Sequence, residues 1–137
     1  MGQPAAKQGD FIQAIDTHVV MVPGTPPVPT PLPHVFLGQL NGGLSDNVRI
    51  SGKAAATVGS TADNSPAHIP TPPGTIFQKA PTNRGTIKRG SVTVYINSKA
   101  AARHGDVAET CNDPGDLPAG TVVVPGGANP AGCVSIG

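Results

Sequence analysis

A short alternation of apolar and polar residues occurs three times along the chain. It spans residues 48–50, 92–96 and 134–136. Alternation with a period of two is typical of a β-strand with one buried face. In the first two copies Ser51-Gly52 or Asn97-Ser98 follows, so each predicts a hairpin with a two-residue turn. The apolar residues that we place on one face of these strands are Val48, Ile50, Val92, Val94, Ile96, Val134 and Ile136.

A second pattern follows the strands. Residues 4–10, 54–60 and 100–106 share the order small residue, Ala, Ala, any two residues, Gly, and Asp or Ser. The copies begin 50 and 46 residues apart (54 − 4 and 100 − 54). Recurrence of one supersecondary unit indicates a repeat architecture. We therefore predict an all-β fold, a small cone of three pseudo-threefold β-hairpin repeats. The best candidate for a helix, residues 98–103, is too short to be useful.

Two proline-rich segments lie between the predicted hairpins. They are residues 22–34, which contain six prolines, and residues 64–75. Proline-rich backbone is stiff and extended. We expect these segments to be loops that form rigid outer walls, and a disordered spacer is the alternative.

The composition favours a compact protein with a thin core. Glycine (18) and proline (16) are abundant, but only 12% of the residues are charged and the net charge is +1, too little for self-repulsion to keep the chain open. Aromatic residues are 3% of the chain, and a small fold with so few needs a disulfide, a metal or a partner. The weak charge speaks against nucleic acid as a partner. The N-terminus shows no signal peptide, so we expect synthesis in the cytoplasm with reduced cysteines.

Histidine and cysteine positions suggest a metal site. His18 and His68 each lie 14 residues after the start of their repeat copy (18 − 4 and 68 − 54). The third copy offers Cys111, and His34 is a possible fourth ligand. Three imidazoles and one thiolate form a closed tetrahedral set that suits Zn²⁺. Spacing alone leaves a second interpretation open, in which these are ordinary polar loop residues.

His104 serves as a comparison. The repeat register aligns it with Gln8 and Val58, which cannot bind a metal. We expect an exposed side chain that is not a ligand.

The repeated segments resemble the Pro-Ala-Ala-Arg repeat of PAAR proteins. The resemblance is carried by Pro4-Ala5-Ala6-Lys7 and Ala100-Ala101-Ala102-Arg103. It is also carried by the strand-and-turn segments that precede the second and third copies, residues 50–53 and 96–99. It extends over essentially the whole chain. The middle copy, residues 54–60, departs from the motif because it lacks Pro, Arg and Asp, and the first copy has Lys for Arg.

PAAR proteins form the tips of contractile injection machines such as type VI secretion systems and phage tails. The resemblance implies a single domain over residues 1–137 with no effector extension. It implies a non-enzymatic tip that is monomeric alone, caps a trimeric spike protein with one chain per trimer, contacts a target membrane transiently and leaves the cell when the machine fires. It also implies a structural zinc site formed by His18, His34, His68 and Cys111.

Two other functions remain open. An enzyme would use Cys111 as a nucleophile with a histidine base, or an open zinc site, although four protein ligands leave no position for water. A secreted module would be closed by a Cys111–Cys133 disulfide.

The surface that meets the spike also has two alternatives. In the first, the apolar face of the strands contacts the spike. In the second, that face is part of the core, and exposed residues such as Arg49, Thr93 and Ser135 contact the spike.

Overall fold

The structure is a computed structural model that describes residues 2–125 and 134–137. Within these residues there is no helix, and so none that could cross a membrane. The strands are β1 (Gln3–Pro4), β2 (Phe11–Val22), β3 (Val28–Gly42), β4 (Arg49–Ile50), β5 (Lys53–Ala54), β6 (Thr61–Asn64), β7 (Ile76–Phe77), β8 (Arg84–Ile87), β9 (Tyr95–Ile96), β10 (Lys99–Ala100), β11 (Val107–Thr110), β12 (Leu117–Val123) and β13 (Ser135–Ile136).

Six strands form a closed antiparallel barrel. Their order is β12-β11-β8-β6-β3-β2, and β12 returns to pair with β2. A seventh strand, β7, adds to the outer part of β2 through Val20 and Met21. The interior is filled by small residues together with Ile12, Phe36, Leu40, Ile87 and Val122. The prediction of an all-β fold is confirmed.

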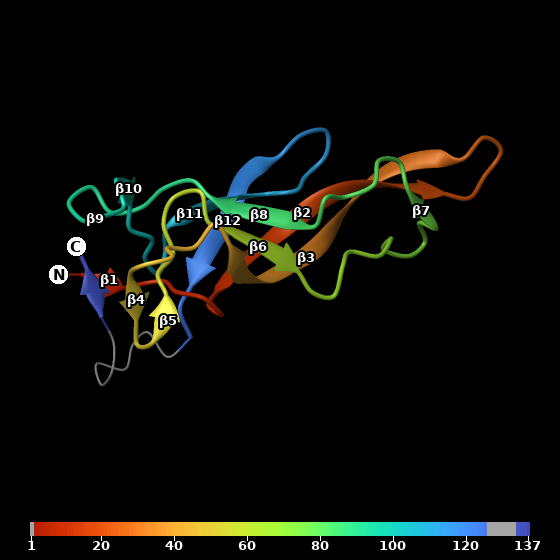
Figure 1. The fold of residues 1–137 in the computed structure, drawn as a ribbon. Helices are drawn as coiled ribbons and strands as arrows, with labels where there is room; N and C mark the ends of the chain where they lie inside the picture. The colour runs from red at the N-terminus through yellow and green to blue at the C-terminus, as the bar shows by residue number, and fades with distance from the viewer. Residues whose placement is uncertain (1, 126–133) are drawn as a thin grey trace.

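The longest element is the hairpin of β2 and β3. Its pairing runs without interruption from Phe11 opposite Gln39 to Val22 opposite Val28. The hairpin extends past the barrel and forms one end of the molecule (Figure 1). The expectation of a loop over residues 22–34 is therefore wrong from Val28 onward.

The prolines of β3 do not prevent this pairing because of their spacing. Pro29, Pro31 and Pro33 occupy alternate positions of the strand. Alternate residues of a strand direct their backbone groups to the same edge, so all three can face away from β2. The ladder to β2 then loses no N–H donor.

Three small hairpins lie at the opposite end, near both termini (Figure 1). They are β4–β5, β9–β10 and β1–β13, the last formed by the two ends of the chain. The turn residues Ser51-Gly52 and Asn97-Ser98 have positive φ, as a type I′ turn requires. Both predicted two-residue turns are confirmed. Residues 98–103 contain β10 and no helix.

Only part of the predicted apolar strand face is buried. Ile50, Ile96 and Ile136 form a cluster with Ala5, Ala55 and Ala101, against which Val48 packs. In contrast, Val92 is 82% exposed, and Val94 and Val134 are also exposed. The prediction of one common face is wrong for these three valines because β9 and β13 are two residues long and the alternation does not extend to them.

The three Ala-Ala segments are joined by a closed ring of backbone hydrogen bonds. Ala6 donates to Ala102, Ala102 to Ala56, and Ala56 to Ala6, at 2.9, 3.0 and 3.0 Å. A second set of three bonds, from the N–H groups of Gln8, Val58 and His104 to the carbonyl groups of Ala54, Ala100 and Pro4, measures 2.8, 2.9 and 2.8 Å. The alanines of the ring are at most 1% exposed, so larger side chains would not fit.

The same turn follows each segment. Its glycine, at positions 9, 59 and 105, has φ of 89°, 95° and 89°. The next residue closes the turn with a side-chain oxygen that accepts a backbone N–H three residues earlier, in the pairs Lys7–Asp10, Thr57–Ser60 and Arg103–Asp106. Serine can replace aspartate in the middle copy because its hydroxyl accepts the same bond.

We expect Gly105→Ala to destabilise the fold through its backbone alone. No atom lies within 4 Å of an added Cβ, but φ is +89°. A left-handed conformation costs an L-residue about 1–2 kcal/mol, or roughly 3–8 °C in Tm for a domain of this size. Gly115→Ala is the matched control, because that site is also open and has no positive φ. Equal Tm values for the two variants, measured by thermal unfolding, would contradict this.

Candidate metal centre

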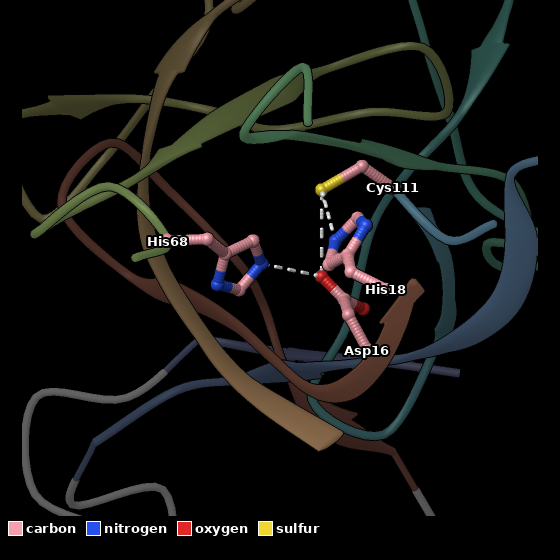
Figure 2. Close-up of side chains that lie close together, drawn as sticks. All are labelled: Asp16, His18, His68 and Cys111. Carbon is pink, nitrogen blue, oxygen red and sulfur yellow. Dashed lines mark hydrogen bonds and ion pairs between the residues drawn. The ribbon is translucent and has the colours of Figure 1, made fainter. Parts of the chain in front are cut away.

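Four potential metal ligands meet inside the protein between the barrel and the projecting hairpin. Asp16 and His18 lie on β2, His68 lies in the segment after β6, and Cys111 directly follows β11. One donor atom from each lies within 4.8 Å of all the others. Figure 2 shows the four side chains converging from three separate parts of the chain. The group could hold a metal ion.

The alternation of β2 places two of these side chains. Ile12, Ala14 and Val20 point inward, and Asp16 and His18 occupy the same face between them. The inward face of β2 therefore carries two polar residues between apolar ones.

Cys111 is fixed by its neighbours in sequence. Asn112 Oδ1 accepts the backbone N–H of Thr17 at 2.7 Å, and Asp113 Oδ2 accepts that of Val19 at 2.9 Å. These bonds hold the residues after β11 against β2 and place the thiol opposite His18.

Asp16 is the central acceptor of the cluster and is fully buried. It accepts hydrogen bonds from His68 Nε2 at 3.0 Å, from Cys111 Sγ at 3.5 Å and from the Thr110 hydroxyl. Across residues 2–125 and 134–137, no lysine or arginine forms an ion pair with it. A buried carboxylate with no lysine or arginine partner is costly, and a metal ion would compensate its charge.

His18 has one nitrogen directed at the thiol and one without a partner. Its Nε2 lies 3.7 Å from Cys111 Sγ. Its Nδ1 is buried without a hydrogen bond, with Asp113 Oδ2 at 3.6 Å. Burial lowers the pKa of His18, and the charge of Asp113 partly opposes this. The neutral imidazole that metal binding requires is thus favoured.

The Cys111 thiol is protonated in the absence of metal. Burial and the charge of Asp16 raise its pKa to about 11, against smaller opposite effects of Asn83 and Thr82. A nucleophilic cysteine needs a lowered pKa, whereas a bound metal deprotonates a ligating thiol outright. The environment therefore suits a metal ligand better than a nucleophile.

The spacing of one pair of donors fits a tetrahedral metal ion. Bonds of the length that zinc forms to sulfur and nitrogen place the two donor atoms about 3.5 Å apart. Cys111 Sγ and His18 Nε2 are 3.7 Å apart. These two atoms therefore have the spacing of two ligands of one ion.

His34, predicted as the fourth ligand, lies beside the cluster. Its ring centroid is 5.4 Å from that of His18 and 5.5 Å from that of His68. Its Nδ1 contacts the carbonyl of Leu32 at 2.9 Å, and its Nε2 accepts the N–H of Thr71 at 3.2 Å. To bind a metal, His34 would have to give up the bond from Thr71.

The structure thus brings together His18, His68 and Cys111 as predicted and adds Asp16, which sequence reasoning missed. The signal that could have identified Asp16 is the alternation of β2 from Ile12 to Val20, which places Asp16 on the same face as His18. His104 is outside the cluster, as expected, but it is half-buried because its Nδ1 accepts the N–H of Val124 at 3.0 Å. The proposed disulfide partner Cys133 lies outside the described residues.

The histidines predict a pH dependence of stability in metal-stripped protein. Burial lowers the pKa of His18 and of His34 below 6.5, so the unfolded chain binds protons more readily than the folded chain. The free energy of unfolding should therefore fall as the pH drops through 6.5 and should level off below the folded-state pKa values. Thermal unfolding between pH 7.5 and 5.5 should show a shallower slope for His34→Gln. A slope unchanged in His34→Gln would contradict the assignment.

Comparisons of the chain with models of protein families, with curated proteins and with solved structures found no match. The resemblance to PAAR proteins therefore rests on the sequence motifs.

Proposed function

We propose that this chain is the spike tip of a contractile injection machine and is stabilised by a bound metal ion, as its resemblance to PAAR repeats implies. The observation that supports this best is the closed ring of hydrogen bonds among residues 6, 56 and 102. Each segment donates to one neighbour and accepts from the other, which is the pattern expected of three pseudo-threefold repeats. A chain with three similar edges can cap a trimer with one copy per three subunits.

The hairpin end is the proposed base. Arg49, Thr93 and Ser135 are exposed there, whereas Ile50 and Ile96 are core residues. This burial supports the alternative in which exposed residues and backbone edges meet the spike. Short strands with free edges invite continuation by strands of a partner.

The proposed metal is Zn²⁺, bound by His18, His68 and Cys111, with Asp16 as the fourth ligand. One thiolate and one carboxylate would balance the charge of the ion in this buried place. His34, implied by the family resemblance, is the alternative fourth ligand. Either set ties β2, the segment after β6 and the segment after β11 together, and metal binding would add to folding stability.

We expect one zinc per chain by elemental analysis. Cys111→Ser and His18→Gln should lower both zinc content and Tm, because each removes a ligand from a closed site. His104→Gln is the control, since it lies outside the cluster and should keep its zinc. Retention of full zinc in Cys111→Ser and His18→Gln would overturn the metal proposal.

The fourth ligand is decided by a second pair of variants. If Asp16 binds the metal, Asp16→Asn should lower zinc affinity by at least tenfold, while His34→Gln should change it little. The reverse order, measured by competition with a chelator, would assign the position to His34.

Capping is tested with the trimeric spike protein of the same injection machine. We expect a complex of one chain with three spike subunits in a light-scattering mass measurement, and a monomer for the chain alone. Thr93→Asp should weaken the complex without unfolding the chain, because Thr93 is exposed at the hairpin end. A stable homotrimer of the isolated chain would contradict the proposal.

A further inference from the structure

The outer surface of the barrel has a hollow of about 550 Å³, a volume within the range of small-ligand sites. Its lining residues come from the turn of the first repeat, from β2 and β3, and from the end of β6. None of the four potential metal ligands is among them. The hollow is therefore a feature separate from the metal centre.

The pairing of the strands places several side chains of this region in one row. Phe11 of β2 lies opposite Gln39 of β3, and Gln39 lies opposite Asp63 of β6. Asp63 in turn lies opposite Arg84 of β8. Side chains directly opposite each other point to the same face of a sheet, with Cβ atoms about 5 Å apart. The row therefore presents an aromatic ring, an amide, a carboxylate and a guanidinium group in that order.

Alternate residues of β3 extend the hollow on both sides of Gln39. Leu37 and Asn41 are exposed on the same face, because each is two positions from Gln39 along the strand. Leu37 is 42% exposed and adds apolar surface. Asn41 Nδ2 donates to Asp63 Oδ2 at 3.3 Å and adds a polar side. Gln39 thus lies between apolar and polar surroundings.

Two glutamine amides of the hollow have no partner in the described part of the protein. Within residues 2–125 and 134–137, no group forms a hydrogen bond with the side chain of Gln8 or Gln39. Each amide offers two N–H donors and a carbonyl acceptor. Both side chains are exposed, so their bonds to water can be exchanged for bonds to a ligand.

The charge of the hollow is nearly balanced. Among the described residues that line it, Asp63 alone carries a formal charge, and its Oδ1 accepts a hydrogen bond from Arg84 Nε at 3.2 Å. One further cation, Lys53, approaches Gly9 at the rim. A nucleic acid requires several cations along its phosphates. The hollow therefore suits a neutral ligand.

The hollow lies over the face of the sheet and away from its edges. Both β3 and β6 are paired on two sides. An extended peptide binds by adding a strand to a free edge, which neither of these strands offers. A ligand of the hollow is therefore recognised by side chains and not by the backbone.

We propose that this hollow binds a neutral oligosaccharide. Sugar hydroxyl groups both donate and accept hydrogen bonds, so they match the amides of Gln8 and Gln39 and the accepting carboxylate of Asp63. The C–H face of a sugar ring can lie against the electron-rich face of Phe11. The row from Phe11 to Arg84 crosses three strand spacings, about 14 Å, which suits a short chain of sugar rings better than a single one.

This inference goes beyond the proposed function and depends neither on the metal nor on the spike. Zinc content and spike binding therefore succeed or fail independently of sugar binding.

The side-chain amides allow a direct test by NMR on the isotope-labelled full chain. Maltotriose, cellotriose and triacetylchitotriose are the probes, and at least one should shift the side-chain signals of Gln8 and Gln39, with saturation below about 10 mM sugar. The signal of Gln78, an exposed glutamine outside the hollow, should not move. The absence of a saturable shift with all three sugars would overturn the proposal. Equal shifts with glycerol at the same hydroxyl concentration would overturn it as well.

Substitutions in the hollow test the cause of binding. Gln39→Ala removes the central amide and should lower the affinity for the sugar about tenfold. Gln78→Ala is the matched control and should leave the affinity unchanged. The amide spectrum outside the hollow reports whether each variant is folded. Equal affinities of the two variants would contradict the assignment.

The aromatic contact has its own signature. In the unmodified chain, the ring of Phe11 should shift the C–H proton signals of the bound sugar upfield. Phe11→Leu keeps an apolar side chain without a ring, so the upfield shift should disappear. Its persistence in Phe11→Leu would show that the sugar does not lie against this residue and would overturn the proposed site.

A second copy of the chain and a nucleic acid are the competing occupants. With a second copy, the Gln39 signal would shift with protein concentration in the absence of sugar. With a nucleic acid, single-stranded oligothymidylate would shift the same signals and the three sugars would not. Either outcome would overturn sugar binding.

Discussion

The rest of the structure depends on the ring of backbone hydrogen bonds among Ala6, Ala56 and Ala102. These residues are separated by about fifty positions in sequence, so closing the ring orders the two long intervening segments together. The ring tolerates only small side chains at its centre, and it positions the barrel strands on one side and the small hairpins on the other. Local propensity contributes little, because several of the strands it organises are only two residues long.

Beyond the ring, the barrel core changes along its length. Near the ring the interior is apolar, with Ile12 and Leu40 among the fully buried residues. Further out the inward positions of β2 become Asp16 and His18, and a buried carboxylate faces two imidazoles and a thiol. A buried polar cluster that could hold a metal ion occupies this part of the interior instead.

The sequence predicted the all-β class, both two-residue turns and three members of the cluster, because each depended on a local pattern or on the register of the repeats. It did not predict the long pairing of β3, since six prolines in residues 22–34 normally argue against a strand. Their alternate spacing was the decisive feature, and it can be interpreted only once the partner strand is known. Asp16 was missed for a related reason: the alternation of β2 includes polar inward residues, which resemble a surface strand until the barrel is closed.

The pairing of β1 with β13 brings the two ends of the chain into one hairpin, with Gln3 opposite Ile136, at the end of the molecule opposite the β2–β3 hairpin (Figure 1). A polypeptide joined to either end would therefore emerge at that end of the molecule, away from the outer part of the β2–β3 hairpin. Genetic fusion at both ends at once would place two passengers next to each other on the same side. The fold thus separates the end of the molecule where further domains could be attached from the end formed by the β2–β3 hairpin.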